Sequence, residues 1–321
     1  MTPVILSAAG IGAALAAGSI QRRWDRLRTV CRSLLVSFLT LVFMFGAGEV
    51  YFRYLHADSE GTLAKNNWIA RFWHVNSFGY RDVEWAEADL TDRQKILVIG
   101  DSFTAGWGIQ DPQDRFSNVL ARTLGEDYAV FNAGVTGTST AEQAETLRAF
   151  PIPPDIVIWQ YFLNDIEYTL LRLGLYEPPP PLPAVVSESY LTNYLYSLTI
   201  IGLDSRYWQH LYAAYDSALV WNLHAREIDE MVHAVQARGV RLILVIFPNM
   251  ADPFGSIAYV DRVVQAARSA GVTDILTLFD AAEAMPLADR IVSPRDAHPS
   301  AAFHRYVGER LAELFFAAPS G

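Results

Sequence analysis

The sequence is nearly free of cysteine: Cys31 is the only one among 321 residues. One cysteine excludes an internal disulfide framework and a metal site built from several thiolates. Cys31 does not suit lipid attachment either, because Arg28, Thr29 and Val30 precede it instead of an apolar run ending in small residues. We expect neither a metal ion nor another cofactor.

Positive charge is also scarce after the first 56 residues. Residues 1–56 contain six arginines and two acidic residues, and the rest of the chain holds 19 basic and 33 acidic side chains. Such an acidic body does not favour nucleic acid as a partner, because binding to phosphates needs basic surface. Disorder is excluded by the 51% apolar and 12% aromatic content, which suffices for a large core.

The longest apolar stretch covers residues 33–52, where Glu49 is the only charged side chain. Its length suits a transmembrane helix, and the arginine-rich segment before it is typical of a cytoplasmic flank. We therefore expect a membrane anchor, with everything after it on the extracytoplasmic side. The alternative is a cleaved signal peptide, for which Gly46-Ala47-Gly48 is an acceptable site, although the preceding charged region is unusually long.

A second apolar stretch, residues 4–20, is rich in Ala and Gly at spacings that allow close helix packing in lipid. It is either a first membrane span, which would form a helical hairpin with the arginines on the cytoplasmic side, or an interfacial segment. Residues 1–56 are thus expected to form a membrane region with one or two helices.

Residues 57–94 read as a polar connector, and short apolar runs then alternate with amphipathic patterns through residues 95–321. Strands are expected at 95–100, 128–134, 155–162, 240–247 and 272–279, and helices at 115–124, 140–150, 224–239, from Tyr259, and at 298–316. We expect an α/β fold, a three-layer α/β/α sandwich around a parallel, flavodoxin-like sheet. An insertion at about 170–223, with a Pro-rich stretch at 177–183 and many aromatic residues, could form a lid or wall.

Four polar motifs fall where strands are expected to end or just before the last helix. They are Gly100-Asp101-Ser102, Asn132 to Gly137, Phe162 to Asp165, and Asp296 to Pro299. In parallel α/β sheets, ligands bind at the carboxyl ends of the strands. We therefore expect the four motifs to share one site.

The residue types in these motifs match the parts that acyl transfer requires. Ser102 would be the nucleophile, His298 the base that removes its proton, and Asp296 the acid that fixes the histidine tautomer. The N–H groups of Ser102 and Gly137 and the side-chain amide of Asn164 would form an oxyanion hole. Glycine at 137 would leave room for a substrate carbonyl, because it has no Cβ.

Asp101 and Asn132 are expected to support this site. Each motif alone also has an ordinary structural explanation: Ser102 as a helix cap, Asn132 and Gly137 as turn residues, and the segment 296–298 as a solvated loop. Their joint occurrence, in this order along the chain, favours the acyl-transfer site.

The motifs GDSFT, NAGVTG, FLND and DAHPS resemble the four blocks of the SGNH/GDSL hydrolase superfamily, over Gly100 to Ser300. The upstream NSFGYRD, with the apolar helix ending EVYFRYL, resembles membrane-anchored members with an exported domain. The resemblance implies a serine ester hydrolase with the residue roles given above. The sequence departs from the family pattern twice: Phe162 stands where the third block usually has glycine, and Asp296 precedes His298 by two residues rather than three.

A few other residues are candidates for a role. His224, Glu230 and His233 could share a helical face at a metal-ligand spacing, but a solvated amphipathic face is the simpler interpretation. His304 is expected to pack within the last helix. Trp107 is expected either to border the pocket or to pack in the core.

Together these features predict a membrane-anchored serine esterase that acts on an O-acyl ester, such as an O-acetyl group of an extracytoplasmic glycan, through an acyl-serine intermediate. The expected partners are that small ester or acylated glycan and, through the N-terminal helix, the membrane. The first alternative is an O-acyltransferase that uses the same residues on a cell-envelope polysaccharide, which a membrane protein partner would favour. The second is a non-catalytic polysaccharide-binding or assembly subunit.

Overall fold

The computed structural model describes residues 2–20, 24–86, 90–176, 180–199 and 205–317. The chain divides into two compact units, which are described separately: Met1–Arg71 with Pro179–Ile201, and Phe72–Pro178 with Gly202–Gly321. The expected connector 57–94 is therefore divided between the units. Arg22 and Arg23 of the basic flank, and the first three residues of the Pro-rich stretch, lie outside the described residues.

The first unit is helical. Its elements are α1 (Thr2–Ser19), α2 (Asp25–Val50), a π-helical turn η1 (Tyr51–Leu55), most of α3 (Lys65–Phe72), α8 (Ala184–Ser187) and α9 (Tyr190–Ser197). The apolar helix predicted at 33–52 extends further than expected, from Asp25 to Leu55, with a hydropathy of 2.0 in its most apolar window and no buried residue there. By length and composition it can cross a membrane, as an anchor or as a signal sequence.

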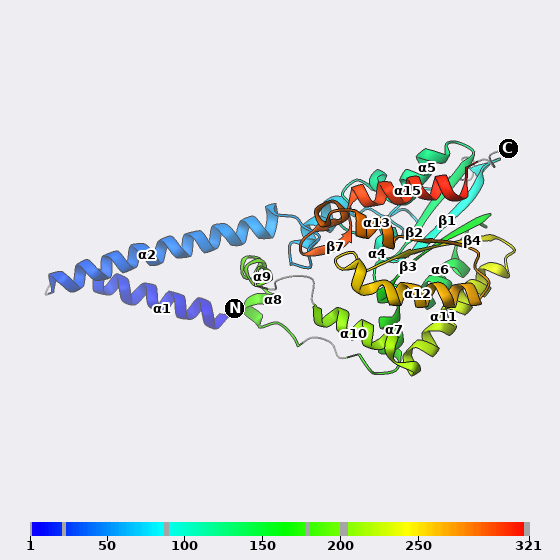
Figure 1. Ribbon diagram of the computed structural model, residues 1–321. Helices are drawn as coiled ribbons and strands as arrows, with labels where there is room; N and C mark the ends of the chain where they lie inside the picture. The colour runs from blue at the N-terminus through cyan, green and yellow to red at the C-terminus, as the bar shows by residue number, and fades with distance from the viewer. Residues whose placement is uncertain (1, 21–23, 87–89, 177–179, 200–204, 318–321) are drawn as a thin grey trace. The chain divides into compact units, whose positions relative to one another are not determined.

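The helix expected at 4–20 is present as α1, which lies alongside α2 (Figure 1). Small residues permit the close approach: a Cβ on Gly12 would lie 3.0 Å from Phe38, and one on Gly18 would overlap the Cys31 side chain. The two helices therefore form a hairpin, the arrangement that the first of the two alternatives for residues 4–20 requires.

The second unit is built on a five-stranded sheet. Its strands are β1 (Gln94–Gly100), β2 (Tyr128–Gly134), β3 (Ile156–Phe162), β4 (Arg241–Phe247) and β5 (Asp274–Thr277). All neighbours pair in parallel, in the order β2-β1-β3-β4-β5. The predicted parallel α/β fold is thus confirmed, and the strand order is the flavodoxin-like one.

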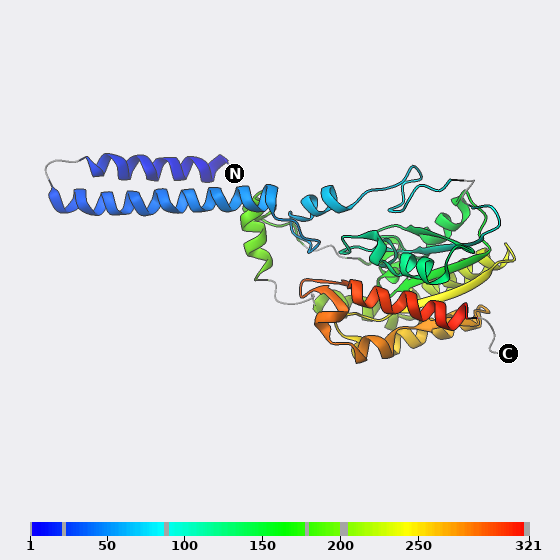
Figure 2. The ribbon, with the colours of Figure 1, turned by 90° about the horizontal axis from the view of Figure 1, so that it is seen from above.

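Helices cover both faces of the sheet (Figures 1 and 2). On one face, alternate strand residues such as Leu97, Val157 and Leu244 pack against α6 (Thr140–Ala149), α11 (Ala218–Gln236) and α12 (Pro253–Ser269). On the other, Ile96, Ile158 and Val245 pack against α5 (Phe116–Leu124), α13 (Phe279–Ala284) and α15 (Ala301–Phe315). Because side chains alternate along a strand, each buried strand supplies both cores.

Two helices begin earlier than the sequence pattern indicated. α12 begins at Pro253 rather than near Tyr259, because Asp252 accepts a hydrogen bond from the N–H of Gly255 (3.0 Å) and proline suits the first helical turn. α11 begins at Ala218 rather than 224, with Ser217 as its N-cap.

The remaining elements of the second unit are short, apart from α10. They are α4 (Ser102–Ala105), η3 (Pro112–Asp114), η4 (Leu163–Ile166), α7 (Glu167–Arg172), α10 (Ser205–Asp216), α14 (Leu287–Arg290), β6 (Ile291–Ser293) and β7 (Asp296–Pro299). β6 and β7 pair antiparallel. The segment 296–299, considered as a solvated loop, is therefore a short strand.

Candidate active site

Ser102 lies where β1 ends and the short helix α4 begins. Asp101 caps this helix, because its Oδ1 accepts a hydrogen bond from the N–H of Phe103 (2.8 Å). The turn is tight: a Cβ on Gly100 would lie 2.3 Å from the side-chain oxygens of Thr104 and Gln160. As the first residue of a helix, Ser102 has a backbone N–H with no acceptor within that helix.

His298 joins Ser102 and Asp296 in a hydrogen-bonded row. The Nε2 atom of His298 lies 2.9 Å from Ser102 Oγ, and its Nδ1 atom lies 2.5 Å from Asp296 Oδ1. Asp296 also accepts a hydrogen bond from the N–H of His298 (3.1 Å), and its side chain is almost entirely buried, while that of His298 is partly exposed. The structure therefore brings together three residues that are up to 196 positions apart in the chain.

Gly137 and Asn164 follow β2 and β3, the two neighbours of β1, the strand that ends just before Ser102. Gly137 is exposed and has a φ of +74°, in the left-handed region that glycine adopts most easily. Asn164 lies in η4, and its Oδ1 atom is buried without a hydrogen-bond partner among the described residues. The backbone conformation thus gives a reason for glycine at 137 beyond the absence of a Cβ.

Asn132 ties the end of β2 to the turn that carries the serine. Its side-chain Nδ2 donates to the carbonyl of Thr104 and to Ser117 Oγ, both at 2.7 Å, and its Oδ1 accepts from the N–H of Gly134 (3.1 Å). Asn132 is buried, so it acts on the position of α4 rather than on solvent-exposed groups. Its hydrogen bonds hold the end of β2 against α4.

Gln160 is a site residue that the sequence reasoning missed. Its Oε1 atom accepts hydrogen bonds from the backbone N–H of Asp101 (3.1 Å) and from the N–H and hydroxyl of Thr104 (3.2 and 2.9 Å). The available signal was one amide residue in the otherwise apolar strand Ile156–Phe162. Burial also raises the pKa of the fully buried Asp101 carboxyl to about 6.

Asp165 connects the third motif to the helix that follows Gly137. Its carboxyl oxygens accept hydrogen bonds from Thr140 Oγ1 (2.9 Å) and Gln143 Nε2 (3.4 Å), both on α6. Burial, followed by the nearby Asp101, raises the pKa of Asp165 well above its usual range. The loop ends that carry Gly137 and Asn164 are therefore joined by buried hydrogen bonds.

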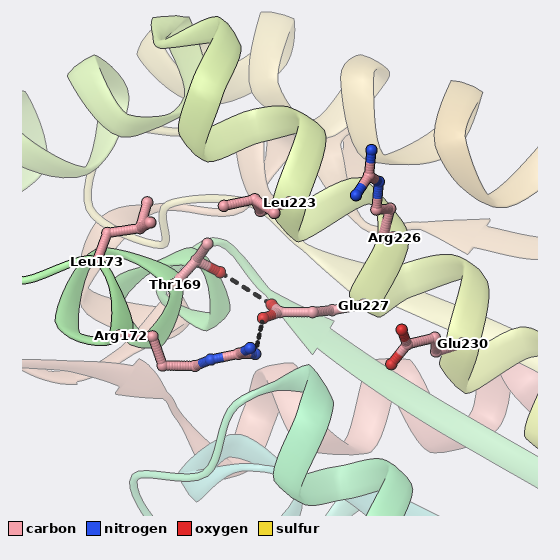
Figure 3. A pocket seen from close by; sticks show the side chains of 7 residues that line it. All are labelled: Thr169, Arg172, Leu173, Leu223, Arg226, Glu227 and Glu230. Atoms are coloured by element: carbon pink, nitrogen blue, oxygen red, sulfur yellow. Dashed lines mark hydrogen bonds and ion pairs between the residues drawn. The ribbon is translucent and has the colours of Figure 1, made fainter.

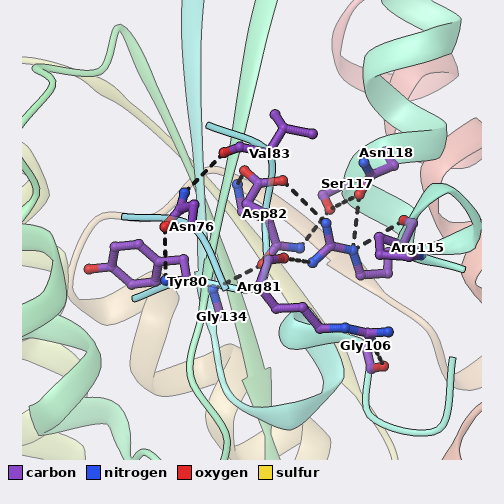
Figure 4. Close-up of polar contacts among 12 residues, drawn as sticks. Asn76, Tyr80, Arg81, Asp82, Val83, Gly106, Arg115, Ser117, Asn118 and Gly134 are labelled. Carbon is purple, nitrogen blue, oxygen red and sulfur yellow. Dashed lines mark hydrogen bonds and ion pairs between the residues drawn. The ribbon is translucent and has the colours of Figure 1, made fainter. Parts of the chain in front are cut away.

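A second buried group, on the segment NSFGYRD, holds the loop after Ser102 (Figure 4). Arg81 donates to the carbonyls of Gly106 and Ile109, both at 2.7 Å. Between them, Gly108 approaches β7 so closely that a Cβ there would lie 3.3 Å from Asp296 Oδ2. Burial, with the nearby Arg115, lowers the pKa of Arg81 to about 10.

The same group reaches β2. Arg115 donates to the Arg81 carbonyl and to Asp82 Oδ1 (3.2 Å), and Asp82 Oδ2 accepts from the N–H of Asn132 (2.9 Å). Burial raises the pKa of Asp82 and lowers that of Arg115. Residues expected as part of a polar connector thus support the turn that bears the serine.

Aromatic side chains lie beside the histidine of the site. Phe103 lies 5.2 Å from the His298 ring and stacks on Phe162 at 4.1 Å, measured between ring centroids. Trp107 lies 6.3 Å from His298 and 5.5 Å from Trp73, so it borders the site rather than the sheet core. Phe162, which replaces the glycine usual in the family, is nearly buried here.

The solvated face proposed for His224, Glu230 and His233 is only partly present. His224 is fully buried and hydrogen-bonds Tyr161 (2.8 Å) and Glu227 (3.0 Å), while the other two residues are exposed. Glu227 also pairs with Arg172 at 2.8 Å beside a cavity of about 270 Å³, shown in Figure 3. The described residues contain no group of three or more metal-ligating side chains.

His304 packs in the core, as expected. Its Nδ1 atom accepts a hydrogen bond from the N–H of Phe116 (3.2 Å), and the two rings stack at 5.8 Å. Burial, followed by the nearby Arg115, lowers the pKa of His304 to about 3. The ring is therefore neutral at physiological pH.

Comparison with known proteins places the chain in a family. Its sequence matches the GDSL-like Lipase/Acylhydrolase family over residues 98–306, and the chain belongs to this family of ester hydrolases. None of the curated proteins compared with it gives a significant match.

Solved structures of low sequence identity are similar to it. A protein described as a lipolytic protein of the G-D-S-L family from Desulfitobacterium hafniense DCB-2 is 16% identical, with a TM-score of 0.44 over 69% of this chain and 99% of that one. A carbohydrate acetylesterase family member from Sinorhizobium meliloti is 15% identical, with a TM-score of 0.40 over 68% of this chain and 96% of that one. The psychrotrophic esterase EstA from Pseudoalteromonas sp. is also 15% identical, with a TM-score of 0.43 over 68% of this chain and 95% of that one.

Proposed function

We propose that this ester hydrolase is a membrane-anchored serine esterase that removes an O-acetyl or similarly small O-acyl group from an extracytoplasmic glycan. The observation that carries the catalytic part is the row Asp296–His298–Ser102, with its two hydrogen bonds of 2.5 and 2.9 Å at the carboxyl ends of the strands. Such a row supplies a nucleophile, a base and the group that orients the base.

The reaction proceeds in two halves. Ser102 Oγ attacks the ester carbonyl carbon while His298 Nε2 takes its proton, and the intermediate collapses by expelling the alcohol, which receives that proton. Water then attacks the acyl-serine, with His298 again as the base, and the carboxylic acid leaves. Asp296 accepts a hydrogen bond from Nδ1–H of His298 throughout, which keeps Nε2 free to accept the serine proton.

Charge on the carbonyl oxygen is stabilised by donors from three chain segments. These are the N–H groups of Ser102 and Gly137 and the side-chain amide of Asn164. Their origin at the ends of β1, β2 and β3 supports this assignment, because neighbouring strand ends converge on one edge of the sheet.

The small size of the acyl group is supported by the aromatic packing beside the serine. Phe103 and Phe162 stack on each other and are almost fully buried, so they fill space next to His298 rather than line an open channel. The extracytoplasmic location is supported by the long apolar helix before the catalytic unit and by the arginines that precede it.

Replacement of the nucleophile tests the catalytic part. Ser102→Ala should lose both acetate release from a chromogenic acetyl ester and covalent labelling by a serine-reactive phosphonate, with an unchanged fold by circular dichroism. A variant that retains activity within about tenfold of the wild type would overturn the assignment of Ser102. A wild-type protein that neither reacts nor is labelled would favour a non-catalytic subunit.

Two further measurements test the substrate and the location. Incubation of the wild type with acetylated glycan should release acetate into water, whereas transfer of the acetyl group to a second glycan would identify an acyltransferase. A reporter fused after His56 should be active outside the cytoplasm, and activity inside would overturn the proposed location.

A further inference from the structure

Helix α9 exposes apolar side chains and buries polar ones. Leu195, Tyr196 and the C-cap residue Leu198 are 50%, 38% and 48% exposed, whereas the N-cap residue Ser189 and Asn193 are 3% and 9% exposed. A helix on a water-facing surface normally shows the opposite distribution. The exposed side of α9 therefore resembles a surface that meets an apolar phase.

α9 is fastened to the outer end of the apolar helix α2. Glu49 accepts hydrogen bonds from Ser189 Oγ (2.8 Å) and from the N–H groups of Tyr190 (3.2 Å) and Leu191 (2.9 Å), so it caps α9 from another helix. Arg53, one turn further along, pairs with Glu49. The only acidic residue of the apolar stretch thus has a structural role.

The orientation of α9 follows from its contacts. Figure 2 shows α9, in green, lying across the end of the blue α2 rather than along it. Leu191 reaches Gly48 of α2, where a Cβ would lie 2.9 Å from its Cδ2, whereas Tyr194 stacks on Phe52 (4.2 Å). Gly48 is four residues, about 6 Å of helix rise, nearer the centre of the apolar span than Phe52.

The leucine stripe of α9 consequently lies toward the apolar centre of α2. Leu195 and Leu198 follow Leu191 at i+4 and i+7, which places all three on one face of the helix. On the other side, Asn193 Oδ1 accepts the N–H of Leu63 (2.8 Å) from the segment that follows the span. The apolar stripe starts where Leu191 contacts Gly48 of α2, and it extends away from α2 along Leu195 and Leu198.

We propose that α9 is a second membrane contact: an interfacial helix whose residues Leu195, Tyr196 and Leu198 lie among lipid acyl chains and headgroups beside α2. This proposal rests on the proposed anchoring of α2 in the membrane. Lipid is the occupant that the structure favours, because the stripe is continuous with the apolar surface of α2, which has no buried residue in its apolar window, and tyrosine is typical of the bilayer interface. The exposed Tyr51 and Tyr54 lie at the same end of the span.

Single-cysteine labelling of the full chain in phospholipid vesicles tests the proposal. In a Cys31→Ser background, cysteine replaces Leu195, Leu198, Phe43 or Leu219 and is labelled with an environment-sensitive fluorophore. Phe43, 75% exposed on α2, reports the span, and Leu219, 60% exposed on α11, is a matched leucine of the second unit. Lipids that carry a nitroxide quencher near the headgroup or near the chain end report depth.

The labels at positions 195 and 198 should emit at shorter wavelength than the label at position 219. They should also lose about half of their emission to the quencher near the headgroup, whereas the label at position 43 should be quenched most by the one near the chain end. If the labels at positions 195 and 198 show the emission and quenching of the label at position 219 while the label at position 43 is in lipid, α9 does not contact lipid, and its face serves another partner. If the label at position 43 is also in water, the proposed membrane anchoring of α2 is wrong. Equal quenching at 219 and 195 would mean that the whole protein lies on the bilayer, which would overturn the assignment to α9.

Discussion

Two residues decide how the histidine of the site is held. Asp296 and His298 lie on the strand β7, and side chains two apart on a strand point to the same side. This geometry places Asp296 Oδ1 against His298 Nδ1 although the family usually has the acid one residue further upstream. The unusual spacing therefore has a local structural explanation.

The role proposed for Asp296 predicts a loss of turnover in Asp296→Asn. Asparagine keeps the shape, but its NH2 group can donate a hydrogen bond to Nδ1, which favours the wrong tautomer of His298. The same change costs about 10⁴ in kcat in serine proteases. We expect at least about a hundredfold loss of kcat at neutral pH, with an almost unchanged melting temperature. Wild-type turnover would show that Ser102 and His298 act as a pair without Asp296.

Burial of His304 predicts a pH-dependent stability. The pKa of His304 in the folded protein, about 3, lies below the ordinary value of 6.5. Between these two pH values the unfolded chain therefore binds a proton that the folded chain does not bind. The neutral, buried His304 therefore contributes fully to the free energy of unfolding above pH 6.5. As the pH falls from 6.5 to about 3, this contribution decreases by about 1.4 kcal/mol for each pH unit. His304→Gln, which carries no charge, should remove this slope.

Urea unfolding of the wild type and of His304→Gln, at several pH values between these limits, measures the difference. Other groups titrate in both proteins and cancel, so the gap between the two free energies of unfolding isolates His304. A gap that does not change with pH would mean that the histidine is accessible to protons in the folded protein.

Residues that belong to strong local patterns were predictable, and residues that act over long distances were not. Ser102 and Asn164 each follow an apolar strand, and Asn132 lies near the end of one, so the pattern itself placed them. Gln160 and Arg81 support the same turn, but their partners lie 56 to 59 and 25 to 28 residues away. Only the folded chain shows what their buried polar atoms bind.

At the level of elements, the sheet was easier to predict than the helices around it. β2 coincides with the predicted 128–134, because its apolar run ends at residues that favour turns. α9 was not predicted as a separate helix, because its polar residues are buried and its leucines exposed, which is the reverse of the usual pattern. Its N-terminal carboxylate cap comes from residue 49, which no local signal could reveal.

The cap supplied by Glu49 predicts that α9 loosens in Glu49→Ala. The change removes the acceptor of three hydrogen bonds and the partner of Arg53. Hydrogen bonds to a charged group contribute about 1.5–3 kcal/mol, so opening of the segment should increase about tenfold or more. Limited proteolysis of the full chain measures this as faster cleavage within 184–199.

Asp25→Ala is the matched control for that experiment. Asp25 is an acid of the same helix, but its side chain is 83% exposed and pairs with Arg28, three residues away. Its replacement should leave the cleavage rate of 184–199 unchanged. Equal cleavage of the Glu49→Ala protein and the wild type would show that other contacts hold α9.

At the scale of the whole molecule, the first unit is formed by two separate stretches of the chain. The N-terminal 71 residues and the segment Pro179–Ile201 form one unit, and the parts before and after that segment form the other. A contiguous reading of the sequence placed 180–199 inside the catalytic domain as part of an insertion. The contacts that assign it to the helical unit, such as Glu49 with Leu191, join residues 142 positions apart.

This division predicts that the catalytic unit folds without the other. Every buried residue of the two sheet-covering cores lies between residues 96 and 312, and none belongs to Pro179–Ile201. A protein that begins at Phe72 can carry a Gly/Ser linker of about ten residues in place of 179–201, which is long enough for a flexible connection. This linker protein should be monomeric and should hydrolyse a small acetyl ester at nearly the wild-type rate.

A protein of residues 57–321 keeps α9 but lacks Glu49 and Phe52. Its exposed apolar face should therefore promote association, which light scattering measures. If the linker protein is unfolded or inactive while 57–321 is monomeric and active, the segment 179–201 belongs to the catalytic unit after all.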